Sequence, residues 1–127
     1  MHNSKSDNRS RKYEIMLEVG GNSIQMKTFV DNSFGNLLDG LIAELKDLPT
    51  GWRSLVKSIQ INHTLEGIDK LILRIDGERI STFYYVQEMI SRCIFGFLTT
   101  LSGCPKGFEE YFSTKINIKY SRLHRDT

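Results

Sequence analysis

The 127-residue chain has 39% hydrophobic and 25% charged residues and a formal net charge of +2 at pH 7. This length fits one domain with a single core, and the apolar runs are too short for a transmembrane helix. Residues 1–12 are polar and lack the apolar centre of a signal peptide. We therefore expect a disordered basic tail there, a cytoplasmic location and no membrane partner.

The net charge conceals an uneven distribution along the chain. Residues 1–12 carry +3 and residues 115–127 carry +3, which leaves −4 for residues 13–114. A dedicated DNA-binding domain would place a basic stripe on the fold itself. The acidic body therefore disfavours specific nucleic-acid binding and suits a basic protein partner.

The predicted domain, residues 13–121, is followed by a basic C-terminal tail at 122–127. The domain opens with a hairpin. Tyr13–Val19 alternates between apolar and polar residues, as a half-buried strand does. Gly20-Gly21-Asn22 predicts a tight turn, because glycine tolerates positive φ. Residues 24–30 are then the return strand of the hairpin.

A helix is predicted after this hairpin. Asp31, Asn32 and Ser33 are candidate N-caps, and the apolar positions of the helix follow the i, i+3, i+4, i+7 rule: Phe34, Leu37, Leu38, Leu41, Ile42 and Leu45. Pro49 and Gly51 end it. A short helical turn at 52–56 and a third strand at 58–62 complete the unit.

The same pattern recurs 56 positions later. Trp52, Leu55 and Val56 fall on Phe108, Tyr111 and Phe112, and after one inserted residue SIQIN falls on KINIK. Eight identities accompany the match: Leu17, Gly21, Ile24, Val30, Gly40, Leu45, Pro49 and Gly51 fall on Leu73, Gly77, Ile80, Val86, Gly96, Leu101, Pro105 and Gly107. We interpret residues 13–63 and 69–121 as a duplicated β-β-α-β unit.

The second unit predicts elements at 70–76, 79–86, 88–101, 108–112 and 115–120. The segment ISTFYYV, residues 80–86, has two interpretations. Ser81 could cap a helix that begins at residue 82, or the segment could be a strand like its counterpart IQMKTFV. Its Thr, Phe, Tyr and Val residues favour the strand, with the helix starting near Glu88.

The predicted fold is α+β: a two-layer structure with a mostly antiparallel six-stranded sheet and two main helices on one face. A pseudo-two-fold axis should relate the halves. Gly40 and Gly96 occupy equivalent mid-helix positions, where glycine costs about 1 kcal/mol relative to alanine. We therefore expect either a close crossing of the helices at these glycines or packing of each glycine against the sheet.

Catalytic chemistry is sparse in the sequence. His2, His63 and His124 have no Cys, Asp or Glu at ligand spacing, so we expect no metal site. Cys93 lies on the apolar stripe of the second helix and is expected in the core, whereas Cys104 lies in a loop without a nearby base. IDGERI contains the Asp-Gly pair of a type I′ turn rather than an acid/base cluster. No glycine loop matches a phosphate- or dinucleotide-binding motif, and we expect neither a cofactor nor enzyme activity.

Strand alternation assigns a surface to the sheet face opposite the helices. Five large apolar side chains and several charged ones should meet there, which is typical of a contact site. The candidate partner-binding residues are Met16, Lys27, Phe29, Ile72, Arg74, Phe83 and Tyr85. The alternative is that the tails or residues 103–113 cover this face and make it part of the core.

Two functions fit such a surface. The first is a non-catalytic protein-binding module, of the inhibitor or immunity type, that acts by occupying a partner protein; a homodimer formed through the sheet face is a variant. The second is a single-stranded nucleic-acid binder, in which aromatic rings stack bases while Lys27, Arg74, Lys119 and the basic tails hold phosphates.

Overall fold

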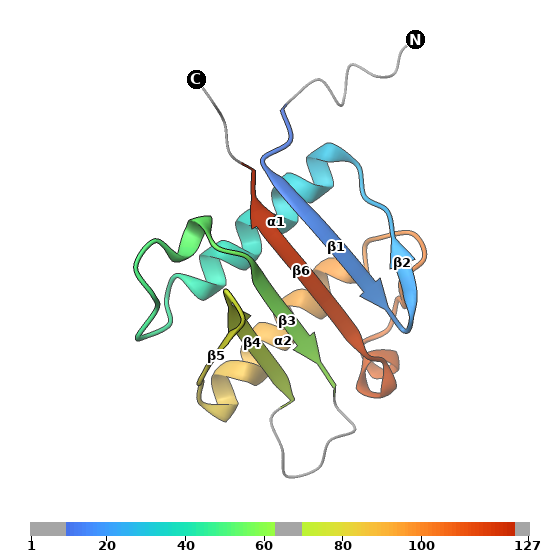
Figure 1. Ribbon diagram of the computed structural model, residues 1–127. Helices are drawn as coiled ribbons and strands as arrows, with labels where there is room; N and C mark the ends of the chain where they lie inside the picture. Colours follow the sequence, from blue (N-terminus) through green and yellow to red (C-terminus); the bar gives the residue numbers. More distant parts are fainter. Residues whose placement is uncertain (1–9, 63–69, 124–127) are drawn as a thin grey trace.

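A computed structural model describes residues 10–62 and 70–123 of the chain, which form one sheet and two helices. The sheet order is β2-β1-β6-β3-β4-β5, and every neighbouring pair is antiparallel. Both helices lie behind the sheet on the same face (Figure 1). The predicted α+β fold is confirmed, with these bounds: β1 Tyr13–Val19, β2 Asn22–Ile24, α1 Thr28–Ile42, η2 Trp52–Ser54, β3 Lys57–Ile61, β4 Leu71–Ile75, β5 Glu78–Ile80, α2 Tyr84–Leu98, η3 Phe108–Ser113 and β6 Ile116–Arg122.

The helix-facing side of the sheet has a symmetric row of side chains. Strand register places one residue of each strand in this row, from edge to edge: Ile24, Leu17, Ile118, Ile59, Leu73 and Ile80. The row contains the same residue types when it is read from either edge. The two halves thus occupy equivalent places about the centre of the β3–β6 pair. A duplicated origin remains the prediction that would account for this symmetry.

The equivalence of the third strands differs from the prediction. Ile59 of β3 pairs with Leu73 of β4, and Ile118 of β6 pairs with Leu17 of β1. Because Leu17 and Leu73 are equivalent positions of the two hairpins, Ile59 corresponds to Ile118. These two positions are 59 apart, whereas the helices begin 56 apart. The second half therefore contains three inserted residues rather than one. They lie in η3, which has six residues against three in η2.

The predicted return strands at 24–30 and 79–86 are wrong beyond their first residues. β2 ends at Ile24 and β5 at Ile80, and the helices begin at Thr28 and Tyr84. In the second half the side chain of Gln87 takes over the edge of β4: its Oε1 accepts hydrogen bonds from the amides of Lys70 (3.1 Å) and Leu71 (3.3 Å). A helical residue thus satisfies the Leu71 amide, which a longer β5 would have satisfied, and β propensity is overridden by tertiary contacts.

The helix starts also differ from the predicted caps. Asp31 and Asn32 lie inside α1, and its N-cap is Lys27, which makes no side-chain cap bond. The side chain of Asn32 instead binds the amide of Lys12 (2.8 Å) and the carbonyl of Ser10 (3.0 Å). Residues 10–12 of the predicted N-terminal tail are therefore held against α1, while residues 1–9 lie outside the described residues. Arg122, the first residue of the predicted C-terminal tail, is instead the last residue of β6, and residues 124–127 lie outside the described residues.

The mid-helix glycines do not mark a helix crossing. Gly40 is exposed, and a Cβ placed on it would have no neighbour within 4 Å, so neither the close crossing nor packing against the sheet is observed there. The helices meet instead where the rings of Phe34 and Phe97 stack at 4.6 Å. The close approach in α1 is at Gly35, which lies directly on the ring of Tyr13.

The predicted type I′ turn in the second half is confirmed. Asp76 and Gly77 have φ of 54° and 84°, and Gly20 and Gly21 of the first hairpin have φ of 60° and 86°. Positive φ at both central residues defines this turn and matches the twist of the two strands.

Within the described residues no helix has the length and apolar character needed to cross a membrane.

Candidate functional site

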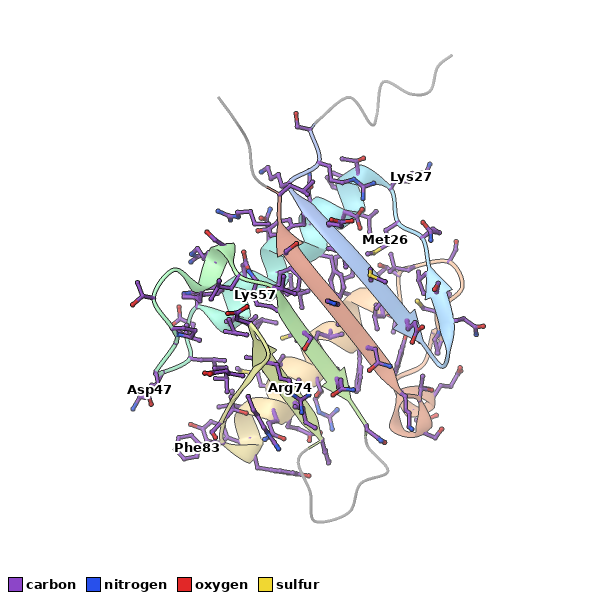
Figure 2. The ribbon with its side chains drawn as sticks, in the orientation of Figure 1. Met26, Lys27, Asp47, Lys57, Arg74 and Phe83 are labelled. Atoms are coloured by element: carbon purple, nitrogen blue, oxygen red, sulfur yellow. The ribbon has the colours of Figure 1, made fainter. Side chains whose placement is uncertain are left out.

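The seven candidate partner-binding residues do not form one surface. Figure 2 places Lys27 and Phe83 at opposite ends of the molecule, with Arg74 on the sheet between them. The helices begin earlier than predicted, and this moves the aromatic residues off the sheet. Three candidates lie on the open sheet face, two at the start of α1 and two at the N-terminal end of α2: Met16, Ile72 and Arg74; Lys27 and Phe29; Phe83 and Tyr85.

The open face of the sheet is polar rather than aromatic. Gln60 at its centre hydrogen bonds Asn117 (3.3 Å) and Arg74 (3.0 Å). Strand alternation places no aromatic side chain on this face in the part of the chain that the structure describes. Segment 103–113 does not cover it either, because Tyr111 stacks on Phe95 of α2 on the helix side. In the described residues its side chains are those of a solvated antiparallel face, with a groove of about 560 Å³ beside Met16 and Gln60. Residues 1–9 and 124–127 of the tails lie outside the described residues.

The exposed apolar side chains gather instead at the start of α2. Phe83, Tyr84, Tyr85 and Met89 are 68%, 56%, 72% and 53% exposed, and we call these four residues the aromatic surface. The rings of Phe83 and Tyr85 stack at 5.9 Å. The ammonium of Lys70 lies over the Tyr84 ring at 5.2 Å. Large apolar side chains that are this exposed within the first turns of one helix are typical of a protein contact site.

A groove of about 630 Å³ adjoins the aromatic surface. Phe83 and Tyr85 line it on the α2 side, and its other apolar residues, Leu45, Ile80 and Val86, are partly buried against the core. Its charged lining comes from the segment after α1 and from β5: Glu44, Lys46, Asp47 and Arg79. An apolar depression with charges of both signs around it can accept an apolar side chain of a partner and orient the polar groups beside it.

A second arrangement, a buried polar network around Asp39, is unrelated to the sequence prediction. Asp39 is 2% exposed, and its Oδ1 accepts hydrogen bonds from Tyr120 (2.7 Å) and from the ammonium of Lys57 (3.2 Å). Its Oδ2 lies 3.1 Å from the hydroxyl of Tyr13. Figure 2 shows Lys57 at the start of β3, where its side chain is fully buried.

Two arginines approach the network from solvent. Arg122 Nη2 and Arg53 Nη1 lie 3.7 and 4.0 Å from Oδ2 of Asp39, and both side chains are about half exposed. The Arg53 guanidinium also lies over the ring of Trp52 at 4.6 Å, and that of Arg122 over the ring of Tyr13 at 5.6 Å. One carboxylate thus meets three cations, including Lys57.

Burial dominates the protonation equilibria of the network. It lowers the pKa of Lys57, although the neighbouring Asp39 carboxylate acts in the opposite direction. It raises the pKa of Tyr120 and Tyr13, and Asp39 adds to both shifts. Elsewhere in the core, burial raises the pKa of Tyr111 to about 12.

These shifts predict a loss of stability at alkaline pH. Above about pH 10 the tyrosines of the unfolded chain ionise, while the raised pKa values of Tyr13, Tyr111 and Tyr120 keep these side chains protonated to a higher pH in the fold. The folded state then binds more protons, so the free energy of unfolding falls as pH rises. Lys57 acts oppositely, because its lowered pKa makes stability rise with pH just below 10.5.

Urea unfolding from pH 8 to 12 measures this dependence, with tyrosinate absorbance followed in parallel. We expect the Tyr111→Phe variant to lose less stability than the wild type between pH 10 and 12. Equal losses in the two proteins would contradict the assignment.

The cysteine expectations change with the structure. Cys93 is exposed on α2, so its prediction as a core residue is wrong, because the buried face of the helix passes through Ile90 and Ile94 instead. Cys104 is buried, and burial raises the pKa of its thiol. His2, His63 and His124 lie outside the described residues. Among the residues that the structure describes, no three His, Cys, Asp or Glu side chains could hold a metal ion.

The sequence contained one overlooked signal for the Asp39 network. Asp39 occupies a position of α1 between the apolar residues Leu38 and Ile42, and its counterpart 56 positions later is Phe95. A carboxylate where the other half has a buried aromatic residue indicates a buried polar site.

Comparison with models of protein families, with curated proteins and with solved structures finds no match to this chain.

Proposed function

We propose that the protein is a non-catalytic protein-binding module, of the inhibitor or immunity type, that acts by occupying a partner protein through the aromatic surface and its groove. The exposure of four large apolar side chains at the N-terminal end of α2, two of them with stacked rings, carries this proposal. Tyrosine and other aromatic residues supply much of the binding energy in protein interfaces, because they bury a large area at a small loss of conformational entropy.

The geometry of the groove supports a protein as the ligand. The groove is large enough for an apolar side chain of a partner beside Phe83 and Val86. Its charged lining, Glu44, Asp47, Lys46 and Arg79, can meet polar groups of either sign on that partner. The charge of −4 on residues 13–114 favours a basic partner through electrostatic steering. A second copy of the chain remains the variant in which the protein binds itself.

The predicted nucleic-acid function is not supported by the positions of the aromatic side chains. It required aromatic rings on the open sheet face, where bases would stack. Phe29, Phe83 and Tyr85 lie instead in or beside the first turns of the two helices. Protein binding is therefore the function that the surface supports best.

Affinity purification from the native host tests the proposal with three baits: the wild type, Phe83→Ser/Tyr85→Ser and Met16→Ser. Met16 is a matched control, because its side chain is also 68% exposed but lies on the open sheet face. We expect a partner that the wild type and Met16→Ser retain and that the double variant loses. With the purified partner, the double variant should bind about thirtyfold more weakly or worse, which corresponds to a hot spot of 2 kcal/mol.

Two results would count against the proposal in different ways. Equal retention of the partner by all three baits would place the binding site elsewhere on the protein. No protein enriched by the wild type over an unrelated bait, together with a monomer in analytical ultracentrifugation, would contradict the binding function itself.

A further inference from the structure

The Asp39 network is present in only one of two equivalent places in the fold. The counterparts of Asp39, Lys57 and Tyr120 in the other half are Phe95, Ile116 and Ile61, all of them buried. Apolar side chains therefore fill the same part of the architecture without any charge. Because a buried ion pair rarely stabilises a protein more than well-packed apolar residues do, the fold itself does not explain why the first half has this network.

The network leaves an excess of positive charge at the surface. Asp39 is one carboxylate among Lys57, Arg53 and Arg122, and its two oxygens already receive Lys57 and two tyrosine hydroxyls. The arginine nitrogens lie 3.7 and 4.0 Å from Oδ2, longer than a charge-assisted hydrogen bond of about 2.7–2.9 Å. Within residues 10–62 and 70–123, most of the five N–H donors of each guanidinium are thus available to a ligand.

The two guanidiniums are also held in place. Each lies over an aromatic ring, Arg53 on Trp52 and Arg122 on Tyr13, and Arg122 donates a hydrogen bond to the Tyr13 hydroxyl (3.3 Å). Because both approach the same oxygen, at 4.0 and 3.7 Å, the two nitrogens are at most 7.7 Å apart. Restraint before binding reduces the entropy that a ligand must remove.

We infer that Arg53 and Arg122 form a binding site for a phosphate group, separate from the aromatic surface. A phosphate offers several oxygens to paired guanidiniums, and arginine recognises it through more than one N–H at once. Asp39 and Tyr13 act as positioning residues that hold the two arginines. The phosphate can come from a small phosphorylated molecule or from the backbone of a nucleic acid, and both sources present the same chemistry.

Trp52 provides a direct reporter, because it is the single tryptophan of the chain and stacks on Arg53. Inorganic phosphate should change its fluorescence saturably, whereas sodium chloride at matched ionic strength should not. We expect Arg53→Gln and Arg122→Gln to bind phosphate about tenfold more weakly or worse, as the loss of a hydrogen bond to a charged group predicts. Lys119 lies on the open sheet face, away from the two arginines, so the Lys119→Gln variant should bind phosphate as the wild type does.

A short oligothymidylate in the same assay distinguishes the two sources. Tighter binding than inorganic phosphate, steep salt dependence and the same response to the arginine variants would assign a nucleic-acid backbone. Binding of inorganic phosphate alone would assign a small ligand. Either result supports the phosphate site.

The wild type alone also tests the site, should an arginine variant fail to fold. In nitrogen–proton spectra, phosphate should shift the side-chain Nε–Hε signals of Arg53 and Arg122. Shifts confined to other arginines, an equal effect of chloride, or a response that does not saturate would overturn the inference. None of these outcomes bears on the aromatic surface, so the two proposals can fail separately.

Discussion

Replacing Asp39 with asparagine should lower the free energy of unfolding by about 3–5 kcal/mol, the usual effect of leaving one partner of a buried pair without its counter-charge. Lys57 would then be a fully buried cation, with the carbonyl of Arg53 at 2.9 Å and a neutral amide as its neighbours. Replacing Lys57 with methionine should have a much smaller effect, about 1 kcal/mol. Asp39 would still receive the hydroxyls of Tyr120 and Tyr13 and lie close to two arginines.

Urea unfolding of the two single variants and the double variant forms a cycle that measures the coupling. Asp39→Asn lowers the free energy of unfolding because it leaves the buried ammonium of Lys57 without a counter-charge. Removing that ammonium as well should therefore make the double variant more stable than Asp39→Asn alone. Equal losses for the two single variants, or a double variant less stable than either, would contradict the asymmetric roles assigned to the pair.

Two glycines of α1 should respond to alanine in opposite directions. A Cβ on Gly35 would lie 2.2–2.6 Å from ring atoms of Tyr13. The ring cannot easily withdraw, because its hydroxyl lies within 3.0 Å of Asn36 and 3.1 Å of Asp39. Overpacking of this kind costs about 1–3 kcal/mol, and we expect that net loss for Gly35→Ala despite the better helix propensity of alanine.

Gly40→Ala is the matched control in the same helix. A Cβ there meets no atom within 4 Å, so the helix propensity of alanine should act alone and raise the free energy of unfolding by about 0.5–1 kcal/mol. Urea unfolding midpoints of both variants measure the difference. Stabilisation by Gly35→Ala would show that Tyr13 is not held against the helix as described.

Much of the fold was predictable because its signals are local. The alternation of Tyr13–Val19 and the glycines that follow gave the correct first strand and turn. The apolar stripe of the second helix was recognised, but its start near Glu88 was placed four residues too late. The early start of α2 places Gln87 in the helix, where its side chain accepts a hydrogen bond from the Leu71 amide of β4. This contact spans 16 residues, so no local sequence pattern contains it.

The candidate surface was predictable in composition and not in position. Phe83 and Tyr85 are exposed, as the prediction required, but they lie at the start of α2 beside a groove rather than on the sheet. Apolar periodicity assigns a helix or a strand through the residues that are buried. Aromatic residues that are exposed do not follow this periodicity, so they do not show which of the two the backbone forms. The error over residues 82–86 therefore moved the whole surface.

The sequence by itself determined the α+β class, the antiparallel hairpins and the two-fold pattern of elements, because apolar periodicity and turn residues act over a few positions. The tertiary structure alone decided where each helix begins and which polar residues meet in the core. Tyr120 and Asp39 are 81 residues apart and come together only when β6 pairs between β1 and β3. The Asp39 network, and the two arginines placed over it, depend on strand order and register, which no stretch of the sequence specifies alone.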